Sequence, residues 1–199
     1  MIPVLPPEPL EALRKFVTAI HPLQDNEWDD FLSVWQPFTA ARKTVLTTAG
    51  ETEKYLYFVT EGVQRAFYMD DNGREATLVF TYAFSFSGVA DSFLLQQPSR
   101  YYFETLTKSE FIRTTYQQIR ELADRYHNFE KMLFKATGFA LAGALERQIE
   151  LQCFSAEKKF RTLLTRSPHV LNMIPHKYLA SYLGIDAATF SKLLGTVRL

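Results

Sequence analysis

The spacing of apolar residues divides the chain into a short helical start, a β-rich middle and a helical end. Between about residues 8 and 36, apolar side chains recur three and four positions apart, which predicts two amphipathic helices. From about residue 44 to residue 115 the pattern changes to short β-branched and aromatic runs separated by turn residues. The Asp-Asn-Gly sequence at 71–73 favours a hairpin, because Asn and Gly tolerate the positive φ angles of a type I′ turn. Strands of this number and spacing favour a small antiparallel barrel or jelly roll, and hence an α+β fold.

Residues 119–147 are predicted to form one long helix with a narrow apolar seam. The seam steps by three and four residues through Ile119, Leu122, Tyr126, Phe129, Leu133, Ala136, Ala140 and Gly143. Such sustained a/d spacing favours a homodimeric coiled coil. A single helix packed on its own domain would use the same residues, so this alternative stays open.

Charge changes the interpretation of the last quarter of the chain. The whole sequence carries 22 basic and 22 acidic residues, but residues 150–199 hold seven Lys or Arg against three Asp or Glu. A basic region of this kind is typical of a surface that binds anions. The same residues are predicted to form several short helices, so we expect a separate helical domain there.

One segment of this helical region has the residue spacing of a helix-turn-helix. Ala180 lies mid-way along the first helix, where a small side chain allows the second helix to cross closely. Gly184 lies at the turn position that needs a positive φ, and Ile185 fills the gap between the helices. Asp186 can cap the second helix, and Phe190 supplies its buried face. The segment is therefore predicted to bind double-stranded DNA.

Candidate DNA contacts are exposed polar positions of the second helix and nearby basic residues. They are Lys177, Thr189, Ser191, Lys192, Thr196 and Arg198. Lys158 is a further candidate for a phosphate contact, whereas Ala187 and Ala188 offer little to bases, so we expect binding that depends on phosphates and dimerisation. Helical hairpins with a glycine at the turn also occur in other folds. A β-roll module with a helical tail that does not bind DNA is the alternative.

Several short motifs follow one another along the chain. They are Tyr57-Phe58-Val59-Thr60-Glu61-Gly62 with Arg65, Asp71-Asn72-Gly73-Arg74-Glu75, Asp91-Ser92-Phe93, Gln97-Pro98-Ser99 and Tyr178 to Ile185. With the predicted order of β-roll, long helix and helix-turn-helix, they resemble the Crp/Fnr family of bacterial transcription regulators. The resemblance implies a cyclic-nucleotide-binding-type sensor domain at 1–118, a dimerisation helix at 119–147 and a DNA-binding domain at 150–199. It also implies a homodimer on operator DNA, with RNA polymerase as a further candidate partner.

The same resemblance implies an effector site in one loop of the roll. Its candidate residues are Gly88, Val89, Ala90, Arg100 and Tyr101. In nucleotide-binding members a helix start presents backbone N–H groups to the cyclic phosphate, and a glutamate accepts the ribose hydroxyl. Val89 replaces that glutamate here, and a buried hydroxyl without an acceptor costs about 1–3 kcal/mol. Cyclic AMP therefore fits poorly, a cyclic nucleotide or other small effector is the candidate ligand, and a DNA-binding protein without any ligand is the alternative.

Other chemistries lack the residues that they need. Cys153 is the only cysteine, which excludes an intrachain disulfide and a cysteine-ligated cluster. None of the four histidines lies between residues 44 and 115, so the roll lacks the metal ligands of a cupin enzyme. The sequence has no Gly-rich phosphate loop and no nucleophile elbow. We expect neither catalytic residues nor a metal site, and a cytoplasmic protein without signal peptide or membrane span.

Overall fold

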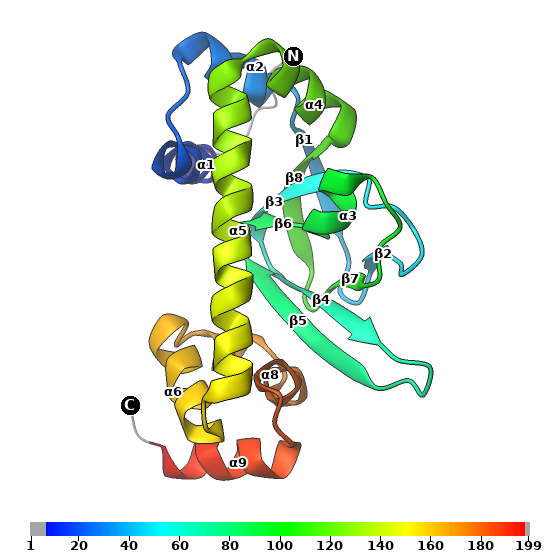
Figure 1. Cartoon of the computed structure of the whole chain (residues 1–199), viewed down its shortest axis with the longest axis vertical. Helices are drawn as coiled ribbons and strands as arrows, with labels where there is room; N and C mark the ends of the chain where they lie inside the picture. The colour runs from blue at the N-terminus through cyan, green and yellow to red at the C-terminus, as the bar shows by residue number, and fades with distance from the viewer. Residues whose placement is uncertain (1–6, 198–199) are drawn as a thin grey trace. The chain divides into compact units, whose positions relative to one another are not determined.

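The structure, a computed structural model, describes residues 7–197 and divides the chain into two compact units. The first unit contains the described residues up to Ala66 together with Phe80–Phe139. The second contains Phe67–Val79 and the described residues from Ala140 onward. The chain therefore crosses between the units three times, twice in one hairpin and once within a long helix (Figure 1).

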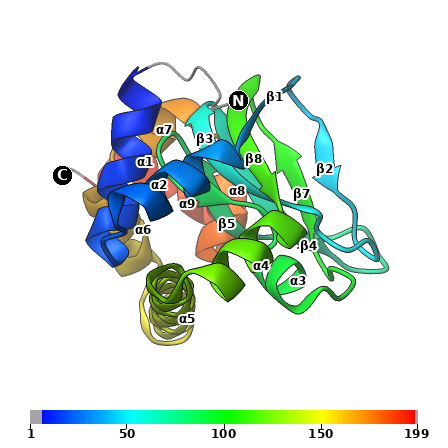
Figure 2. The ribbon, with the colours of Figure 1, turned by 90° about the horizontal axis from the view of Figure 1, so that it is seen from above.

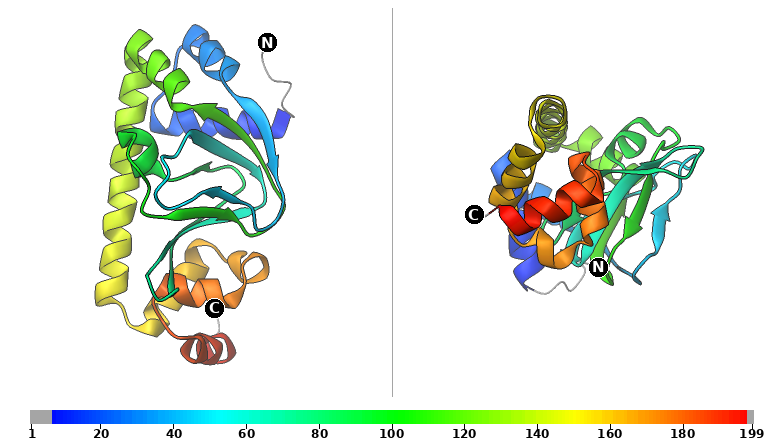
Figure 3. Two further views of the ribbon diagram at one scale, coloured as in Figure 1. Left: turned by 90° about the vertical axis from the view of Figure 1, so that its right-hand side faces the viewer. Right: turned by 90° about the horizontal axis from the view of Figure 1, so that it is seen from below.

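The first unit is built on two four-stranded sheets with the strand orders β1-β8-β3-β6 and β2-β7-β4-β5. The strands are β1 (Gln36–Ala40), β2 (Val45–Thr47), β3 (Tyr55–Glu61), β4 (Val63–Met69), β5 (Glu75–Tyr82), β6 (Phe86–Ser87), β7 (Tyr102–Thr105) and β8 (Ser109–Thr115). Antiparallel pairing joins β1 to β8, β8 to β3, β3 to β6, and β2 to β7. The curved strands, seen in the left view of Figure 3, confirm the predicted jelly roll.

Helices cover one part of this roll and share its main core. They are α1 (Pro7–Ile20), α2 (Asp25–Ser33), α3 (Ala90–Leu95), α4 (Tyr116–Arg125) and the first half of α5 (His127–Cys153). Leu13 and Val17 of α1 and Phe31 of α2 pack with Phe58 and Ile112 of the sheet, and all five are almost fully buried. Figure 2 looks onto α1 and α2, which are the two helices predicted between residues 8 and 36.

The region predicted as one helix over 119–147 contains two helices, because the backbone is extended at Tyr126. This break allows the Tyr126 hydroxyl and the Arg125 guanidinium to donate to Asp30 Oδ2 of α2, at 2.7 Å and 2.9 Å. The hydrogen bond from Tyr126 is the main cause that lowers the pKa of Asp30. The single long helix was therefore wrong at this position, and α5 continues to Cys153, beyond the predicted end.

The predicted seam faces the core of the first unit over most of its length. Ile119, Leu122 and Phe129 are buried there, and Leu133 and Ala136 pack against the same cluster. The last two seam positions, Ala140 and Gly143, are exposed. The alternative of a helix packed on its own domain is thus correct for the first part of the seam.

The second unit contains the tip of the β4–β5 hairpin, the second half of α5 and four shorter helices. The helices are α6 (Ala156–Arg166), α7 (Val170–Met173), α8 (His176–Leu183) and α9 (Ala187–Thr196). At the hairpin tip, Asp70 Oδ1 accepts from the backbone N–H groups of Asn72 and Arg74, and Gly73 has a φ of +75°. The turn predicted at 71–73 is present.

Gly62 and Gly50 provide a matched test of packing in the roll, because both have a φ of +93°. A Cβ at Gly62 would lie 2.5 Å from both the Lys108 carbonyl oxygen and Ser109 Oγ, whereas a Cβ at Gly50 meets nothing within 4 Å. We expect Gly50→Ala to cost about 1–2 kcal/mol for the backbone conformation alone. Gly62→Ala should cost about 1–3 kcal/mol more from the steric clash. Urea unfolding measures both, and equal losses would contradict the close approach at Gly62.

Candidate functional site

The helices α8 and α9 form the predicted helix-turn-helix. Gly184 ends α8 with a φ of +62°, and the N–H of Ile185 donates to the Ala180 carbonyl at 3.1 Å. Ala180 is 3% exposed, which confirms that a small residue lies where the helices cross. Asp186 then caps α9 by accepting from the Thr189 N–H at 2.8 Å. Ala180, Gly184 and Asp186 thus behave as their spacing predicted, and Ile185, predicted to fill the gap between the helices, is half-buried.

A small aromatic and aliphatic core holds α9 against α6 and α8. The Phe190 ring meets the Phe160 ring edge-on at 5.4 Å between centroids and lies 5.3 Å from the His176 ring. Leu179 and Leu183 of α8 are fully buried beside them. The opposite side of α9, toward the viewer in the right view of Figure 3, is exposed along most of its length.

Four of the six candidate DNA contacts lie on exposed surface, namely Lys177, Ser191, Lys192 and Thr196. Thr189 is half-buried, and its hydroxyl donates to Asp186 Oδ2 at 2.7 Å, which is the main cause that lowers the pKa of Asp186. The Thr196 hydroxyl donates to the Lys192 carbonyl at 2.9 Å. Both threonine hydroxyls therefore retain only their acceptor capacity for a ligand. Arg198 lies outside the described residues.

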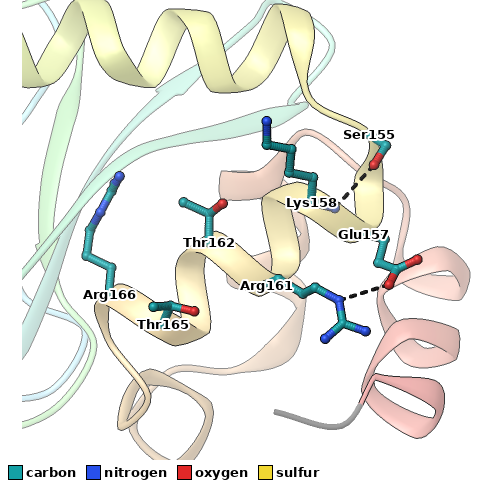
Figure 4. Close-up of a pocket in the computed structure, with 7 residues that line it drawn as sticks. All are labelled: Ser155, Glu157, Lys158, Arg161, Thr162, Thr165 and Arg166. Atoms are coloured by element: carbon teal, nitrogen blue, oxygen red, sulfur yellow. Dashed lines mark hydrogen bonds and ion pairs between the residues drawn. The ribbon is translucent and has the colours of Figure 1, made fainter.

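A groove of about 490 Å³ along α6 was not predicted (Figure 4). It is lined by Ser155, Glu157, Lys158, Arg161, Thr162, Thr165 and Arg166. Lys158 Nζ lies 3.6 Å from the Phe154 ring centroid, and Arg161 Nε donates to Glu157 Oε1 at 2.9 Å. Sequence reasoning had selected Lys158 alone. The signal it missed is the helical spacing, which places residues 158, 161, 162 and 165 on one face.

A buried carboxylate joins α5 to the neighbouring helices of the second unit. Glu150 accepts from Arg147 at 2.7 Å and from Arg166 of α6 at 2.6 Å, and its side chain is 8% exposed. Arg147 also donates to the Tyr182 carbonyl of α8 and lies 3.9 Å from the centroid of the Tyr182 ring. Burial raises the pKa of Glu150, but its hydrogen bonds from Arg147 and Arg166 outweigh burial and leave that pKa below its usual value.

The Ser181 hydroxyl connects α8 to the hairpin tip. Ser181 Oγ accepts from the Thr77 N–H at 3.0 Å and donates to the Glu75 carbonyl at 3.2 Å. The hydroxyl therefore satisfies two backbone groups of β5 that have no strand beyond them on that side. This contact is consistent with the assignment of the hairpin tip, Phe67–Val79, to the second unit.

The loop predicted to bind an effector packs on a buried glutamate that the sequence analysis missed. Glu53 is 1% exposed, and its Oε2 accepts from the Val89 N–H at 3.2 Å. Burial raises the pKa of Glu53, and its hydrogen bonds, the one from Thr47 foremost, offset that rise only in part. Of the other candidates, Ala90 and Arg100 are exposed, and Tyr101 is half-buried against the interior cluster of the roll.

Aromatic side chains fill the interior of the roll. Tyr57, Phe103 and Phe111 are each at most 2% exposed, and they contact one another. The Arg113 guanidinium lies between the Phe38 and Tyr55 rings, 3.9 Å and 4.0 Å from their centroids. Burial is the main cause that raises the pKa of Tyr57, and the charge of Glu53 raises it further.

One face of α5 exposes a row of large apolar side chains. Phe134, Leu141, Leu145 and Ile149 are 82%, 61%, 52% and 55% exposed. The first three follow helical steps of seven and four residues, and Gly138 occupies the position between Phe134 and Leu141. We call these residues the exposed stripe of α5. At about 100° per residue, the stripe lies opposite the face that carries Phe129 and Ala136.

Comparison with known proteins identifies the fold. Residues 38–126 match the family model of the cyclic nucleotide-binding domain. FixK2 from Bradyrhizobium japonicum is similar, with a TM-score of 0.72 and 18% identity over 81% of this chain and 83% of that chain. The Thermus thermophilus catabolite activator protein gives a TM-score of 0.57 and 22% identity over 96% and 90%. CLP from Xanthomonas campestris, a c-di-GMP responsive global regulator, gives 0.62 and 17% over 86% and 90%. No curated protein matches the sequence.

None of the helices within residues 7–197 combines enough length with enough apolar character to span a membrane.

The Glu150 cluster predicts how the stability of the helical unit depends on pH. Because its folded pKa lies below its unfolded value, Glu150 contributes stability that is fully present above about pH 4.3 and is lost as the pH falls through the folded pKa. Glu150→Gln should remove that dependence and cost about 1–3 kcal/mol at neutral pH. Urea unfolding at several pH values measures both effects. The exposed Glu157→Gln is the control and should change little; an equal loss in both variants would contradict the role of the cluster.

Proposed function

We propose that this chain, whose residues 38–126 form a cyclic nucleotide-binding domain within the fold of Crp/Fnr-type regulators, is a homodimeric DNA-binding transcription regulator. The observation that carries the proposal is the helix-turn-helix of α8 and α9, with its close crossing at Ala180 and its capped second helix. The proposed domains are a sensor at 1–118, a dimerisation helix at 119–147 and a DNA-binding domain at 150–199. Operator DNA is the proposed partner, and RNA polymerase is a further one.

The exposed polar residues of α8 and α9 differ in the DNA groups that they can contact. Lys192 can donate to a base or a phosphate, and Ser191 can donate or accept, because both side chains are exposed. Thr189 and Thr196 can accept from base amino groups, since their hydroxyl protons are already used. Lys177 at the start of α8 is suited to a phosphate. We propose Arg198 as a further basic contact.

The groove along α6 adds a second basic surface to the same unit. Its cations Lys158 and Arg161 lie among the hydroxyls of Ser155, Thr162 and Thr165. Ammonium, guanidinium and hydroxyl groups are the side chains that bind phosphate oxygens. We propose that this groove follows the DNA backbone beside the bases that α9 contacts. It compensates for the two alanines at the start of α9, which offer bases little.

The exposed stripe of α5 supports dimerisation. Four large apolar side chains in one row are costly to leave in water, and the first three, with Gly138 between Phe134 and Leu141, match the spacing of the seam of a two-helix coiled coil. Gly138 within the stripe permits close approach of a second helix. We therefore propose that a second copy of the chain covers the stripe, which differs from the seam chosen from the sequence. In such a dimer the two α9 helices would meet half-sites about one turn of DNA apart.

The dimer can be tested by charge at the stripe. Leu145→Glu places a carboxylate in the proposed helix pair, so the dimer should dissociate in sedimentation velocity measurements at micromolar concentration. Ala144→Glu adds the same charge about 100° around the helix and should leave the dimer intact. Circular dichroism should show both variants folded. A Leu145→Glu protein that remains dimeric would exclude this face of α5 as the interface.

DNA binding can be tested by fluorescence anisotropy on an operator selected from genomic fragments. Affinity should fall steeply as salt rises, because phosphate contacts release counterions. Lys192→Ala should weaken operator binding by about 1–3 kcal/mol, and more than binding to random DNA, where the lysine contacts a base. An equal loss on both DNAs would make Lys192 a phosphate contact. The control is Lys54→Ala, an exposed lysine of the first unit, which should bind as the unaltered chain does.

The same measurement decides between this proposal and its alternative. A folded dimer that binds no selected fragment at any salt concentration would favour a β-roll module whose helical tail does not bind DNA. Binding that is strong but insensitive to Lys192, Lys177 and Lys158 substitutions would place the DNA on another surface.

A further inference from the structure

We propose that the Glu53 carboxylate occupies the position next to Gly88 and Val89 in the β-roll where the negatively charged group of an effector would bind. The sensor would then reject cyclic nucleotides and hold one state without them. This goes beyond the proposed DNA binding, and the free protein is sufficient to test it.

Glu53 is surrounded by hydrogen-bond partners from several segments, and we call this set of contacts the clamp. Its Oε2 accepts from the Thr47 hydroxyl at 2.6 Å and from the Val89 N–H at 3.2 Å, while Oε1 accepts from the Tyr55 N–H at 3.2 Å. Its own N–H donates to Ser92 Oγ of α3 at 2.9 Å. Three donors on three segments therefore converge on one carboxylate that is almost fully buried. A buried carboxylate requires such donors, and once they are engaged they cannot serve a ligand.

Gly88 shows how closely the loop packs on this carboxylate. It has a φ of +115°, and a Cβ placed on it would lie 3.2 Å from the Tyr55 carbonyl oxygen and 3.5 Å from Glu53 Oε2. Gly88, a candidate residue of the effector site, thus packs closely against the Glu53 side chain. An anion entering between Gly88 and Glu53 would also meet a like charge at short range.

The arginines inside the roll have partners of their own, and Arg65 Nε donates to Glu104 Oε1 at 2.6 Å. Arg113 could neutralise an incoming phosphate, but its guanidinium lies between the Phe38 and Tyr55 rings. Tyr57 and Phe103 close the interior beside it. The cyclic nucleotide implied by the domain family therefore does not fit the residues that are present. Glu53 supplies the negative charge that the loop would otherwise take from a ligand.

The direct test is nuclear magnetic resonance of the full chain labelled with ¹⁵N. In the unaltered chain, cyclic AMP, cyclic GMP and cyclic di-GMP should leave the Gly88 and Val89 amide resonances and the Tm unchanged. Glu53→Gln keeps the shape but removes the charge that the Val89 N–H contacts, so the Val89 amide proton should move upfield. The exposed neighbour Glu51→Gln is the matched control and should leave the Val89 resonance in place.

Two results would overturn the proposal. The first is a cyclic nucleotide that raises the Tm of the unaltered chain and shifts the Gly88 and Val89 resonances. The second is a Val89 amide that responds equally to the Glu53 and Glu51 substitutions. Where Glu53→Gln fails to fold, hydrogen exchange of the unaltered chain decides: the Val89 amide should be protected, and rapid exchange contradicts the clamp. None of these outcomes depends on DNA, so a failure here leaves the proposed function standing.

Discussion

The need to satisfy buried charge organises both units of this protein. Among the buried carboxylates are Glu53 in the roll and Glu150 at the end of α5, and a buried charge without donors would be strongly destabilising. Each of these two therefore accepts hydrogen bonds from more than one segment of the chain. Glu53 is contacted by Thr47, Tyr55 and Val89, and Glu150 by Arg147 and Arg166. The first arrangement fixes the loop before α3, and the second fixes how α5 meets α6 within the helical unit.

The sequence predicted those features whose requirements are local. Ala180, Gly184 and Asp186 lie within seven consecutive residues, so spacing alone identified the helix-turn-helix. The face of α5 could not be predicted in the same way, because the helix is apolar on two sides. The spacing of apolar residues cannot show which side of α5 faces the protein, with Ala136, and which side faces outward, with Leu145. The break at Tyr126 and the role of Glu53 depend on partners 96 and 36 residues away, and no local pattern records such contacts.

The connections between the units limit how the sensor could influence the helix-turn-helix. The chain crosses only within the β4–β5 hairpin and within α5, so any mechanical coupling through the backbone must use these elements. Within the helical unit both elements reach α8, the hairpin through Ser181 and α5 through Arg147 and the Tyr182 carbonyl. The first helix of the helix-turn-helix thus receives both connections. In the proposed regulator, a displacement of the hairpin or of the long helix would therefore act on α8.

If its own glutamate fills the anion site of the roll, DNA binding would be controlled by dimerisation and not by an effector. In the proposed regulator, Glu53 leaves the roll little to gain from a cyclic nucleotide, and the concentration of the proposed dimer would be the variable that sets DNA occupancy. The exposed side of α9 can bind bases weakly in such a dimer, because two linked half-site contacts add avidity that neither α9 helix has alone. The proposed phosphate contacts along the α6 groove would then supply affinity, and the spacing of the two half-sites would supply part of the specificity. Because the start of α9 offers few contacts to bases, DNA recognition by the proposed regulator would depend on the geometry of the dimer more than on individual side chains.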